Sequence, residues 1–354
     1  MKKIKIQSAS SVAAALRLLP PETAHDLTLK SLQLGLYKFL PKPAFDCDYS
    51  NYRVTLPQLG ELPHPIGLAA GFDKSADCCE QLFSLGFSFV EIGTVTPMPQ
   101  QGNPKPRLFR LPESRSIVNR MGFNNAGVSH VARKMGEVVK ASPTLKVGLN
   151  VGKNKTTPNH LAIEDYLIGI DQFAPLAKYL VVNISSPNTP DLRDLASREF
   201  LQHLAERKPH LKNKVWIKLD PDMSRKRFQG LIEDIADLGF AGLVLSNTHR
   251  TTLPESGGLS GHSLSVLSTT MLEWAYHVHE GKLPMIASGG VLSGMDVFQK
   301  MIRGASAVQI YAALIYRGPW AVYHLLEELA WELRLRKIDF VSDIVGKYYD
   351  PDFS

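Results

Sequence analysis

Residues 179–189 read Tyr-Leu-Val-Val-Asn-Ile-Ser-Ser-Pro-Asn-Thr. The apolar run 179–184 has the length and composition of a strand that is covered on both faces. The hydroxyls and amides that follow it would project from the end of that strand, where parallel α/β folds keep their chemistry. Asn183 and Asn188 suit a ring with alternating C=O and N–H groups, and Ser186 is a candidate proton acceptor or nucleophile. The simpler interpretation is a polar turn with Pro187 at its corner.

Similar runs recur along the chain from residue 64 onward. Strands are predicted at 66–70, 87–92, 146–151, 179–184, 215–219, 242–246, 285–288 and 307–310. Helical patterns are found at 75–85, 125–141, 163–177, 197–208, 224–238, 264–281, 294–303 and 319–335. Strands that alternate with helices pair in parallel, and eight such units close a (β/α)8 TIM barrel. The long interval 95–124 is expected to be an insertion over the top of the barrel, where it would bear on the active site.

The residues before the barrel predict a separate helical extension. Leu29, Leu32, Leu36 and Phe39 form one apolar stripe, and a shorter helix precedes it at about residues 12–19. We expect a helical hairpin over 1–43, a linker over 44–63 and the barrel domain over 64–354. The pattern leaves two alternatives open: a hairpin that packs only on its own barrel, or one that leaves apolar surface for lipid or a lipid-soluble substrate.

Charge and cysteine content narrow the function classes. Residues 1–42 hold seven basic and two acidic side chains, so the remaining chain, with 33 basic and 32 acidic ones, is nearly neutral. A nucleic-acid-binding face is therefore not expected, whereas a basic end beside an apolar helix suits an anionic membrane surface. No run of 18 apolar residues is present, so no membrane span is predicted. Cys47, Cys78 and Cys79 form no C-x-x-C pair, which argues against a disulfide framework, an iron–sulfur cluster or structural zinc and favours a reducing compartment.

The residues that follow the predicted strands are rich in amides, lysines and glycines and poor in histidines and carboxylates. A metal hydrolase is therefore not expected. Gly289-Gly290 after the seventh strand and the backbone after the eighth resemble the phosphate cradle of many barrels. Lys218 lies in an apolar strand, where its ammonium needs a partner. That partner is either an acid such as Asp220 or Asp222, or a flavin, whose reduced form is anionic. The phosphate cradle, the strand-borne lysine and the asparagines together point to a flavin mononucleotide (FMN) enzyme that acts on a polar ring.

Five long motifs resemble those of the dihydroorotate dehydrogenase family. They are 67–74 (GLAAGFDK), 91–97 (EIGTVTP), 119–125 (NRMGFNN), 183–189 (NISSPNT) and 257–261 (GGLSG). Soluble members of this family use cysteine in the fourth turn, whereas the membrane-associated, quinone-reducing class uses serine and carries an N-terminal helical hairpin. Ser186 and the predicted hairpin both indicate that second class.

The resemblance implies an oxidation of dihydroorotate to orotate, with FMN as the hydride acceptor and a membrane quinone as the final electron acceptor. Ser186 would remove a proton from C5, with Thr189 and an ordered water as the first steps of its proton relay. Substrate would be held by Lys74, Asn119, Arg120, Met121, Gly122, Phe123, Asn183, Asn188, Asn247 and Thr248. FMN would be held by Ala70, Gly71, Thr94, Asn150, Asn183, Lys218, Ser246, Gly261, Gly290, Tyr311 and Ala312. His25, Arg107 and Tyr311 match positions that line the quinone tunnel.

Three positions depart from the commonest family pattern. Ser246 stands where threonine is usual, Ala312 lacks a hydroxyl near the phosphate, and Asp220 replaces a small apolar residue. None of these changes removes a reacting group, but Asp220 is expected to affect Lys218 and so the flavin potential.

Alternatives remain: a soluble enzyme using fumarate or a nicotinamide partner, a flavin barrel for a dihydropyrimidine or dihydrouridine, and a binding protein without turnover. The soluble enzyme would need cysteine at position 186. The dihydrouridine enzyme would need an excess of basic residues in the barrel domain, and the binding protein would have lost Ser186 or the lysines. The expected location is peripheral, on the cytoplasmic face of a bacterial inner membrane rather than in mitochondria, because no Arg/Ser-rich transit segment is seen.

Overall fold

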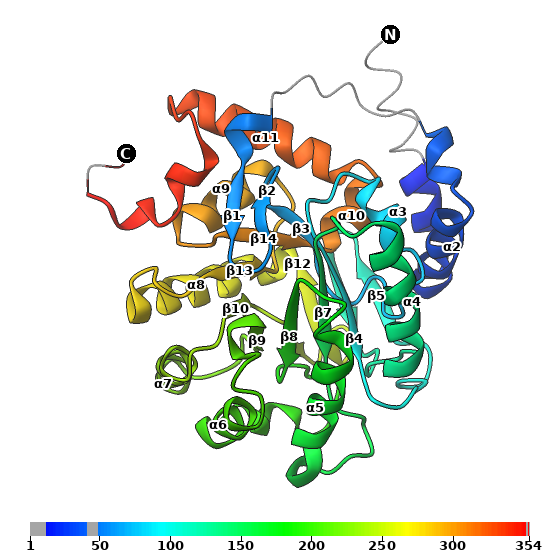
Figure 1. Ribbon diagram of the computed structural model, residues 1–354. Coiled ribbons are helices and arrows are strands. Elements are labelled where there is room, and N and C mark those ends of the chain that lie inside the picture. Colours follow the sequence, from blue (N-terminus) through cyan, green and yellow to red (C-terminus); the bar gives the residue numbers. More distant parts are fainter. Residues whose placement is uncertain (1–11, 41–48, 352, 354) are drawn as a thin grey trace.

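A closed barrel of eight parallel strands forms the centre of the protein. The computed structural model describes residues 12–40, 49–351 and 353. Around the barrel the strand order is β10-β13-β14-β3-β4-β7-β8-β9 (Figure 1). The strands are β3 (Ile66–Leu68), β4 (Val90–Val95), β7 (Val147–Val151), β8 (Tyr179–Asn183), β9 (Val215–Leu219), β10 (Gly242–Leu245), β13 (Met285–Ser288) and β14 (Ala307–Ile310). Each overlaps one of the eight predicted apolar runs, so the predicted TIM barrel is confirmed.

Helices cover the outside of the barrel. They are α3 (Cys79–Phe83), α4 (Val128–Ala141), α5 (Ala162–Phe173), α6 (Arg198–Arg207), α7 (Arg225–Asp237), α8 (Ser265–His279), α9 (Gly294–Ile302), α10 (Ala312–Arg317) and α11 (Ala321–Leu335). The first helix is shorter than its predicted range of 75–85. The Asp73 carboxylate accepts three backbone N–H groups from residues 75–78, at 2.9 to 3.2 Å, which stabilises a turn instead of a helix.

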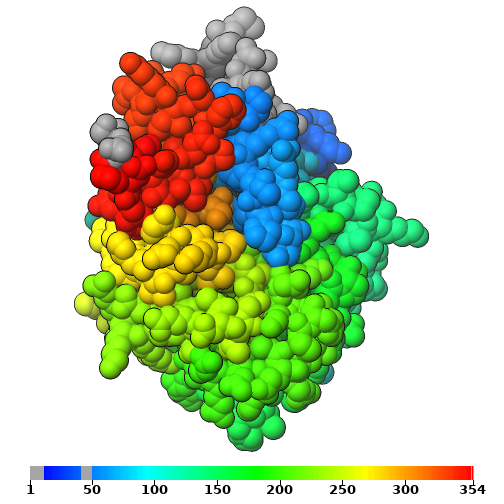
Figure 2. Space-filling view, turned by 60° about the vertical axis from the view of Figure 1, so that its left-hand side comes forward, coloured from blue at the N-terminus to red at the C-terminus, as the bar shows by residue number. Residues whose placement is uncertain are grey.

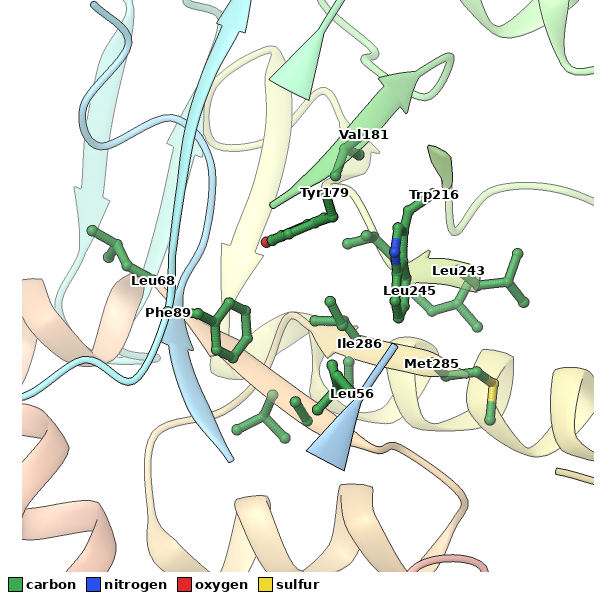
Figure 3. Close-up of a cluster of buried hydrophobic side chains, with 14 of the residues drawn as sticks. Leu56, Leu68, Phe89, Tyr179, Val181, Trp216, Leu243, Leu245, Met285 and Ile286 are labelled. Carbon is green, nitrogen blue, oxygen red and sulfur yellow. The ribbon is translucent and has the colours of Figure 1, made fainter. Parts of the chain in front are cut away.

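A hairpin closes the amino-terminal end of the barrel. Strands β1 (Val54–Leu56) and β2 (Gly60–Leu62) pair in antiparallel fashion, and Leu56, Leu59 and Leu62 are fully buried. Figure 3 draws Leu56 and Ile286 within one cluster of buried hydrophobic side chains. In Figure 2 the residues around 50–60, in blue, lie between the red C-terminal segment and the green half of the barrel. The expected linker 44–63 thus contains ordered structure in its described part, while residues 44–48, with Cys47, lie outside the described residues. The domain boundaries stay a prediction.

The N-terminal extension forms two helices on the side of the barrel. Residues 12–18 are helical, and α2 (Pro21–Gln33) follows after Pro20. The second helix ends earlier than predicted because Gly35 adopts a positive φ of 71°, after which a 3-10 helix, η1 (Leu36–Phe39), completes the extension. Helix α2 contacts α3 and strand β5 (Leu108–Leu111) (Figure 1). The basic residues Lys2, Lys3, Lys5 and Lys42 lie outside the described residues.

A second sheet lies over the carboxyl end of the barrel. Strands β5 and β6 (Ser116–Asn119) come from the predicted insertion, and β11 (His249–Thr251) and β12 (Gly257–Gly261) come from the loop after the sixth barrel strand. They form one antiparallel sheet in the order β11-β12-β6-β5, which we call the upper sheet. The insertion therefore lies where it was expected, but its pairing with a segment about 140 residues away was not predicted. Among the described helices, none is both long and apolar enough to cross a bilayer.

Candidate active site

A hollow lies between the carboxyl end of the barrel and the upper sheet. It measures about 1150 Å³, including its opening to solvent. Most of the predicted substrate and flavin residues line it: Ala70, Gly71, Lys74, Thr94, Asn119, Met121, Gly122, Phe123, Asn183, Ser186, Asn188, Lys218, Ser246, Asn247, Thr248, Gly261, Gly290, Tyr311 and Ala312. Residues far apart in sequence come together because all eight strands end on this side.

A chain of side-chain hydrogen bonds runs along the floor of the hollow. The Thr94 hydroxyl donates to Asn150 Oδ1 at 2.6 Å and accepts from Asn183 Nδ2 at 2.9 Å. Asn183 Oδ1 in turn accepts from the Ser185 hydroxyl at 2.8 Å and from Asn247 Nδ2 at 3.3 Å. Each amide therefore has one orientation that satisfies its neighbours, so the polar groups are fixed before any ligand binds.

The fourth turn carries Ser186 into this hollow. Ser186 is buried, and its hydroxyl oxygen accepts the Asn188 backbone N–H at 3.2 Å. Asn188 Nδ2 donates to Asn119 Oδ1 at 3.2 Å, which ties the turn to strand β6 of the upper sheet. The serine thus lies under a cover made by the insertion, out of bulk water.

Two titratable groups in the hollow have strongly shifted pKa values. Burial, with a smaller repulsion from Arg107, lowers the pKa of Lys74 to about 8. Burial lowers the pKa of His25 to about 3, and repulsion from Lys74 adds to this. His25 is therefore neutral at physiological pH, whereas Lys74 keeps most of its positive charge at pH 7 and can attract an anionic substrate.

Glycines after the sixth and seventh strands make a narrow cradle. Gly261 and Gly290 have φ values of 85° and 76°, a region that side chains other than glycine rarely adopt. A Cβ at Gly290 would collide with the Ser265 backbone, and one at Gly261 with the Arg115 carbonyl and the Ser116 Cα. Three residues that line the hollow have a buried polar atom without a hydrogen-bond partner among the described residues: His25 Nδ1, Gln309 Oε1 and Thr248 Oγ1. The site therefore has unused capacity for a polar ligand.

A second, apolar hollow lies under the N-terminal helices. It measures about 1420 Å³ with its opening, and its walls come mainly from residues 12–40, α10 and strand β5. His25, Leu108, Ile117 and Tyr311 line both hollows and so form the wall between them. One alternative was that the N-terminal extension packs only on its barrel. The structure instead has an apolar cavity between the extension and the barrel, beside the polar hollow.

Four predicted site residues line neither hollow. Thr189 is buried beside the fourth turn, and Asn150 lies beneath Thr94. The Arg120 side chain pairs with Glu255 at 2.9 Å. Arg107 pairs with Glu22 at 2.7 Å and donates to the backbone of the insertion, so it joins α2 to the upper sheet. The roles predicted for these four residues remain predictions. Thr189 and Asn150 would act on a ligand only through residues next to them that line the hollow.

Other lining residues were missed by the sequence analysis. Arg17 and Arg110 line the apolar hollow, where Arg17 donates to the Tyr316 carbonyl at 2.9 Å and Arg110 to the Arg17 carbonyl at 2.6 Å. Their presence in otherwise apolar segments was the one feature of the sequence from which these two lining residues could have been predicted. Gln309, in strand β14, gave no such signal because its surroundings depend on the closed barrel.

The partner of Lys218 differs from both acids considered above. Its ammonium lies 3.8 Å from the fully buried carboxylate of Glu91 on β4. Asp220 instead lies 3.4 Å from Arg193, and Asp222 also pairs with that guanidinium. The two acids lie beyond the end of β9 and approach the Arg193 side chain, while Lys218 faces the barrel axis.

Comparisons with known proteins agree with the resemblance noted in the sequence. The profile of a family described as dihydroorotate dehydrogenase matches residues 53–333. A mitochondrial mouse protein named dihydroorotate dehydrogenase (quinone) is 40% identical over 353 residues, covering 93% of this chain and 87% of that one. A protein of the same name from Rhodospirillum rubrum is also 40% identical, covering 94% and 93% of the two chains.

Solved structures resemble the chain over nearly its whole length. A ligand-free dihydroorotate dehydrogenase from Eimeria tenella has a TM-score of 0.86 and 34% identity, covering 94% of this chain and all of that one. The same enzyme in complex with ferulenol gives a TM-score of 0.85 and 33% identity, covering 94% and 96%.

Proposed function

This chain belongs to the dihydroorotate dehydrogenase family, and from that premise we propose that it oxidises dihydroorotate to orotate and passes the electrons to a membrane quinone. The observation that carries the proposal is the pair of adjoining hollows, one polar and one apolar, separated by His25 and Tyr311. A polar pyrimidine and a lipid-soluble acceptor require such different surroundings. Under this proposal, electrons cross the wall formed by His25 and Tyr311, so dihydroorotate and the quinone do not need to meet.

The polar hollow fits FMN as the cofactor that joins the two half-reactions. The glycine cradle at Gly261 and Gly290 leaves room for a phosphate, and the unpartnered Gln309 and Thr248 oxygens offer acceptors for ligand N–H or O–H groups. We propose that the FMN-binding residues are those named from the sequence, with Asn150 acting through Thr94. Bound FMN would supply the hydride acceptor at the floor of the hollow.

The chain's own residues would bind and orient the substrate ring. The asparagines at 119, 183, 188 and 247 present fixed amides to the hollow, as described above, and Lys74 supplies a positive charge for the orotate carboxylate. Backbone groups of Gly122 and its neighbours complete the wall. The upper sheet excludes water, which strengthens each of these polar contacts.

Ser186 is proposed as the base that removes the C5 proton. An alcohol is a weak base at neutral pH, so its proton must pass onward as it is accepted. Thr189, buried three residues further along the same turn, is proposed as the first relay group, with a water as the next. Ser186→Ala should therefore slow flavin bleaching by dihydroorotate by about 10²- to 10⁴-fold while reoxidation by quinone stays normal.

The N-terminal helices are proposed to rest on a membrane surface. Leu18, Leu34 and Phe39 expose 88, 74 and 84% of their surface, an unusual degree for large apolar side chains on neighbouring segments. Quinone would enter the apolar hollow from the lipid, with His25 and Tyr311 at its inner end and Arg107 outside its walls. A peripheral position on the cytoplasmic face of a bacterial inner membrane stays a prediction, since the mouse and Rhodospirillum relatives match equally well.

One assay tests substrate, cofactor and acceptor together. Purified protein should be yellow, should bleach under anaerobic conditions with dihydroorotate, and should recolour with a quinone but not with fumarate or NAD. Bleaching without recolouring by quinone would contradict the proposed acceptor. Protein without bound flavin, or protein that dihydroorotate does not bleach, would contradict the proposal as a whole.

A further inference from the structure

A fully buried carboxylate lies at the centre of the barrel. Glu91, on β4, accepts from Asn150 Nδ2 at 2.7 Å, from Gln309 Nε2 at 2.6 Å and from the Tyr179 hydroxyl at 3.3 Å. The Lys218 ammonium lies 3.8 Å away. These four partners come from β7, β14, β8 and β9, so five of the eight strands meet at this group.

Such an arrangement is costly unless the partners are well placed. Burying a carboxylate is unfavourable, and only hydrogen bonds together with an opposite charge offset the lost hydration. In Figure 3 the Tyr179 ring extends from its strand into the barrel interior among apolar side chains. A core of apolar residues could have filled this space, so stability alone does not account for the charge.

Two of the four partners connect Glu91 to the polar hollow. Lys218 and Gln309 both line that hollow, and the Gln309 amide uses its N–H on Glu91, which leaves its carbonyl oxygen free for a ligand. A third partner, Asn150, gives its N–H to Glu91 and its carbonyl to Thr94, from which the hydrogen-bond chain continues to Asn183. The orientation of three ligand-facing groups therefore depends on one carboxylate.

We propose that Glu91 is a positioning residue that holds Lys218, Gln309 and Asn183 in place and whose negative charge sets the reduction potential of the bound flavin. The proposal rests on the proposed FMN-dependent function. Lys218 alone would stabilise the anionic reduced form of the flavin, and a carboxylate behind it reduces that effect. The pair keeps electrons from being held too tightly for their transfer to the second hollow.

The test is the replacement Glu91→Gln, which keeps the shape of the side chain and removes its charge. The measurement is the two-electron midpoint potential of the bound FMN, by equilibration with a reference dye. We expect the reduction equilibrium to shift at least tenfold toward the reduced form, which is about 30 mV for a two-electron couple. Tyr179→Phe is the matched control, because it removes one donor to the same carboxylate and keeps the charge; its potential should stay within about 10 mV of the wild type.

The affinity of FMN for the apoprotein, measured by flavin fluorescence, gives a second readout. Glu91→Gln should weaken FMN binding because Asn183 and Gln309 lose their fixed orientation. A Glu91→Gln protein with bound flavin whose potential equals that of the wild type would overturn the inference and leave the proposed function intact. Wild-type protein without flavin would instead refute the proposed function itself.

A second comparison decides the matter if Glu91→Gln does not fold. Lys218→Met leaves the carboxylate unpaired, whereas Lys218→Met with Glu91→Gln replaces the pair by two neutral side chains, a change that buried pairs often tolerate. The double variant should have a higher flavin potential than the single one. An equal or lower potential, or a double variant that cannot fold, would mean that the carboxylate serves only the packing of the barrel.

Discussion

Arg193 is predicted to fasten the turn that carries Ser186. Its Nε donates to the Ser185 carbonyl at 3.1 Å, and its Nη2 donates to the Thr248 carbonyl at 3.0 Å. Its Nη1 pairs with Asp222 and lies 3.4 Å from Asp220. One partly buried guanidinium thus links the turns after the fourth, fifth and sixth barrel strands. Arg193→Met should therefore free the serine turn from its neighbours.

The expected size of the effect follows from these contacts. A hydrogen bond to a charged group contributes about 1.5–3 kcal/mol, and contributions within one network do not add fully. If the two carbonyl contacts together contribute about 1.5–3 kcal/mol to the reactive geometry, the rate constant of flavin bleaching should fall about 10- to 150-fold. Arg193→Lys should recover little, because an ammonium cannot reproduce the fork that reaches both carbonyls.

The assay is anaerobic stopped-flow bleaching of the bound flavin by dihydroorotate, followed by reoxidation with a quinone. Reoxidation should stay within about twofold of the wild type, since Arg193 lies outside the apolar hollow. Arg198→Met is the control, because that side chain is 53% exposed and its partner Asp234 lies on a neighbouring helix. An exposed pair of this kind contributes little, because solvent screens its charges. Bleaching by Arg193→Met at more than a third of the wild-type rate would refute the reasoning.

Three further predictions concern other parts of the molecule. Asp220→Ala should slow bleaching less than fivefold and leave the flavin potential unchanged, because Asp220 approaches Arg193 and not Lys218; a shifted potential measured by dye equilibration would contradict this. Burial lowers the pKa of Lys300 to about 7, so between that value and its ordinary pKa of about 10.5 the unfolded chain binds more protons, and stability should rise with pH. The gain from pH 7 to 9 should be on the order of 2 kcal/mol for this group, and Lys300→Met should remove it in denaturation experiments at the two pH values. Phe39→Ser should weaken sedimentation with anionic vesicles several-fold, whereas Leu253→Ser, which changes an equally exposed apolar side chain elsewhere, should not; equal losses would argue against a membrane face on the N-terminal helices.

Much of the fold could be predicted because its determinants are local. Each barrel strand is a short apolar run, and each helix has its own periodicity, so both can be recognised without knowledge of tertiary contacts. The turns at the strand ends are also local, and the barrel topology alone brings Ser186, Asn247 and Lys74 to one hollow. The upper sheet could not be found in this way, because β6 and β12 are separated by about 140 residues and neither has a clear alternation of its own.

Neither of the two acids considered as partners of Lys218 pairs with it, for a related reason, while a flavin as its partner stays a prediction. Asp220 and Asp222 are near in sequence, and strict strand alternation would even place them on the face of Lys218. However, β9 ends at Leu219, and both acids lie in the turn beyond it, where they approach Arg193. Glu91 is 127 residues away in sequence and lies in a strand that otherwise looks like ordinary core. Only closure of the barrel places β4 and β9 so that these two side chains approach each other, so no sequence window contains the pairing.

Under the proposed function, the wall between the two hollows would let one chain serve two chemically different substrates. Burial keeps His25 neutral and raises the pKa of Tyr311 to about 12, so neither side chain brings a charge to the wall at physiological pH. Phe72 packs edge-on against both rings, with centroids 5.1 and 6.0 Å apart, which leaves an aromatic layer between Lys74 on one side and the apolar leucines of α2 on the other. A charged residue in that layer would draw water into the apolar hollow and would require its own partner. Under the proposed function, this uncharged wall would keep an anionic pyrimidine out of the apolar hollow and would still leave only a short distance for electrons to travel.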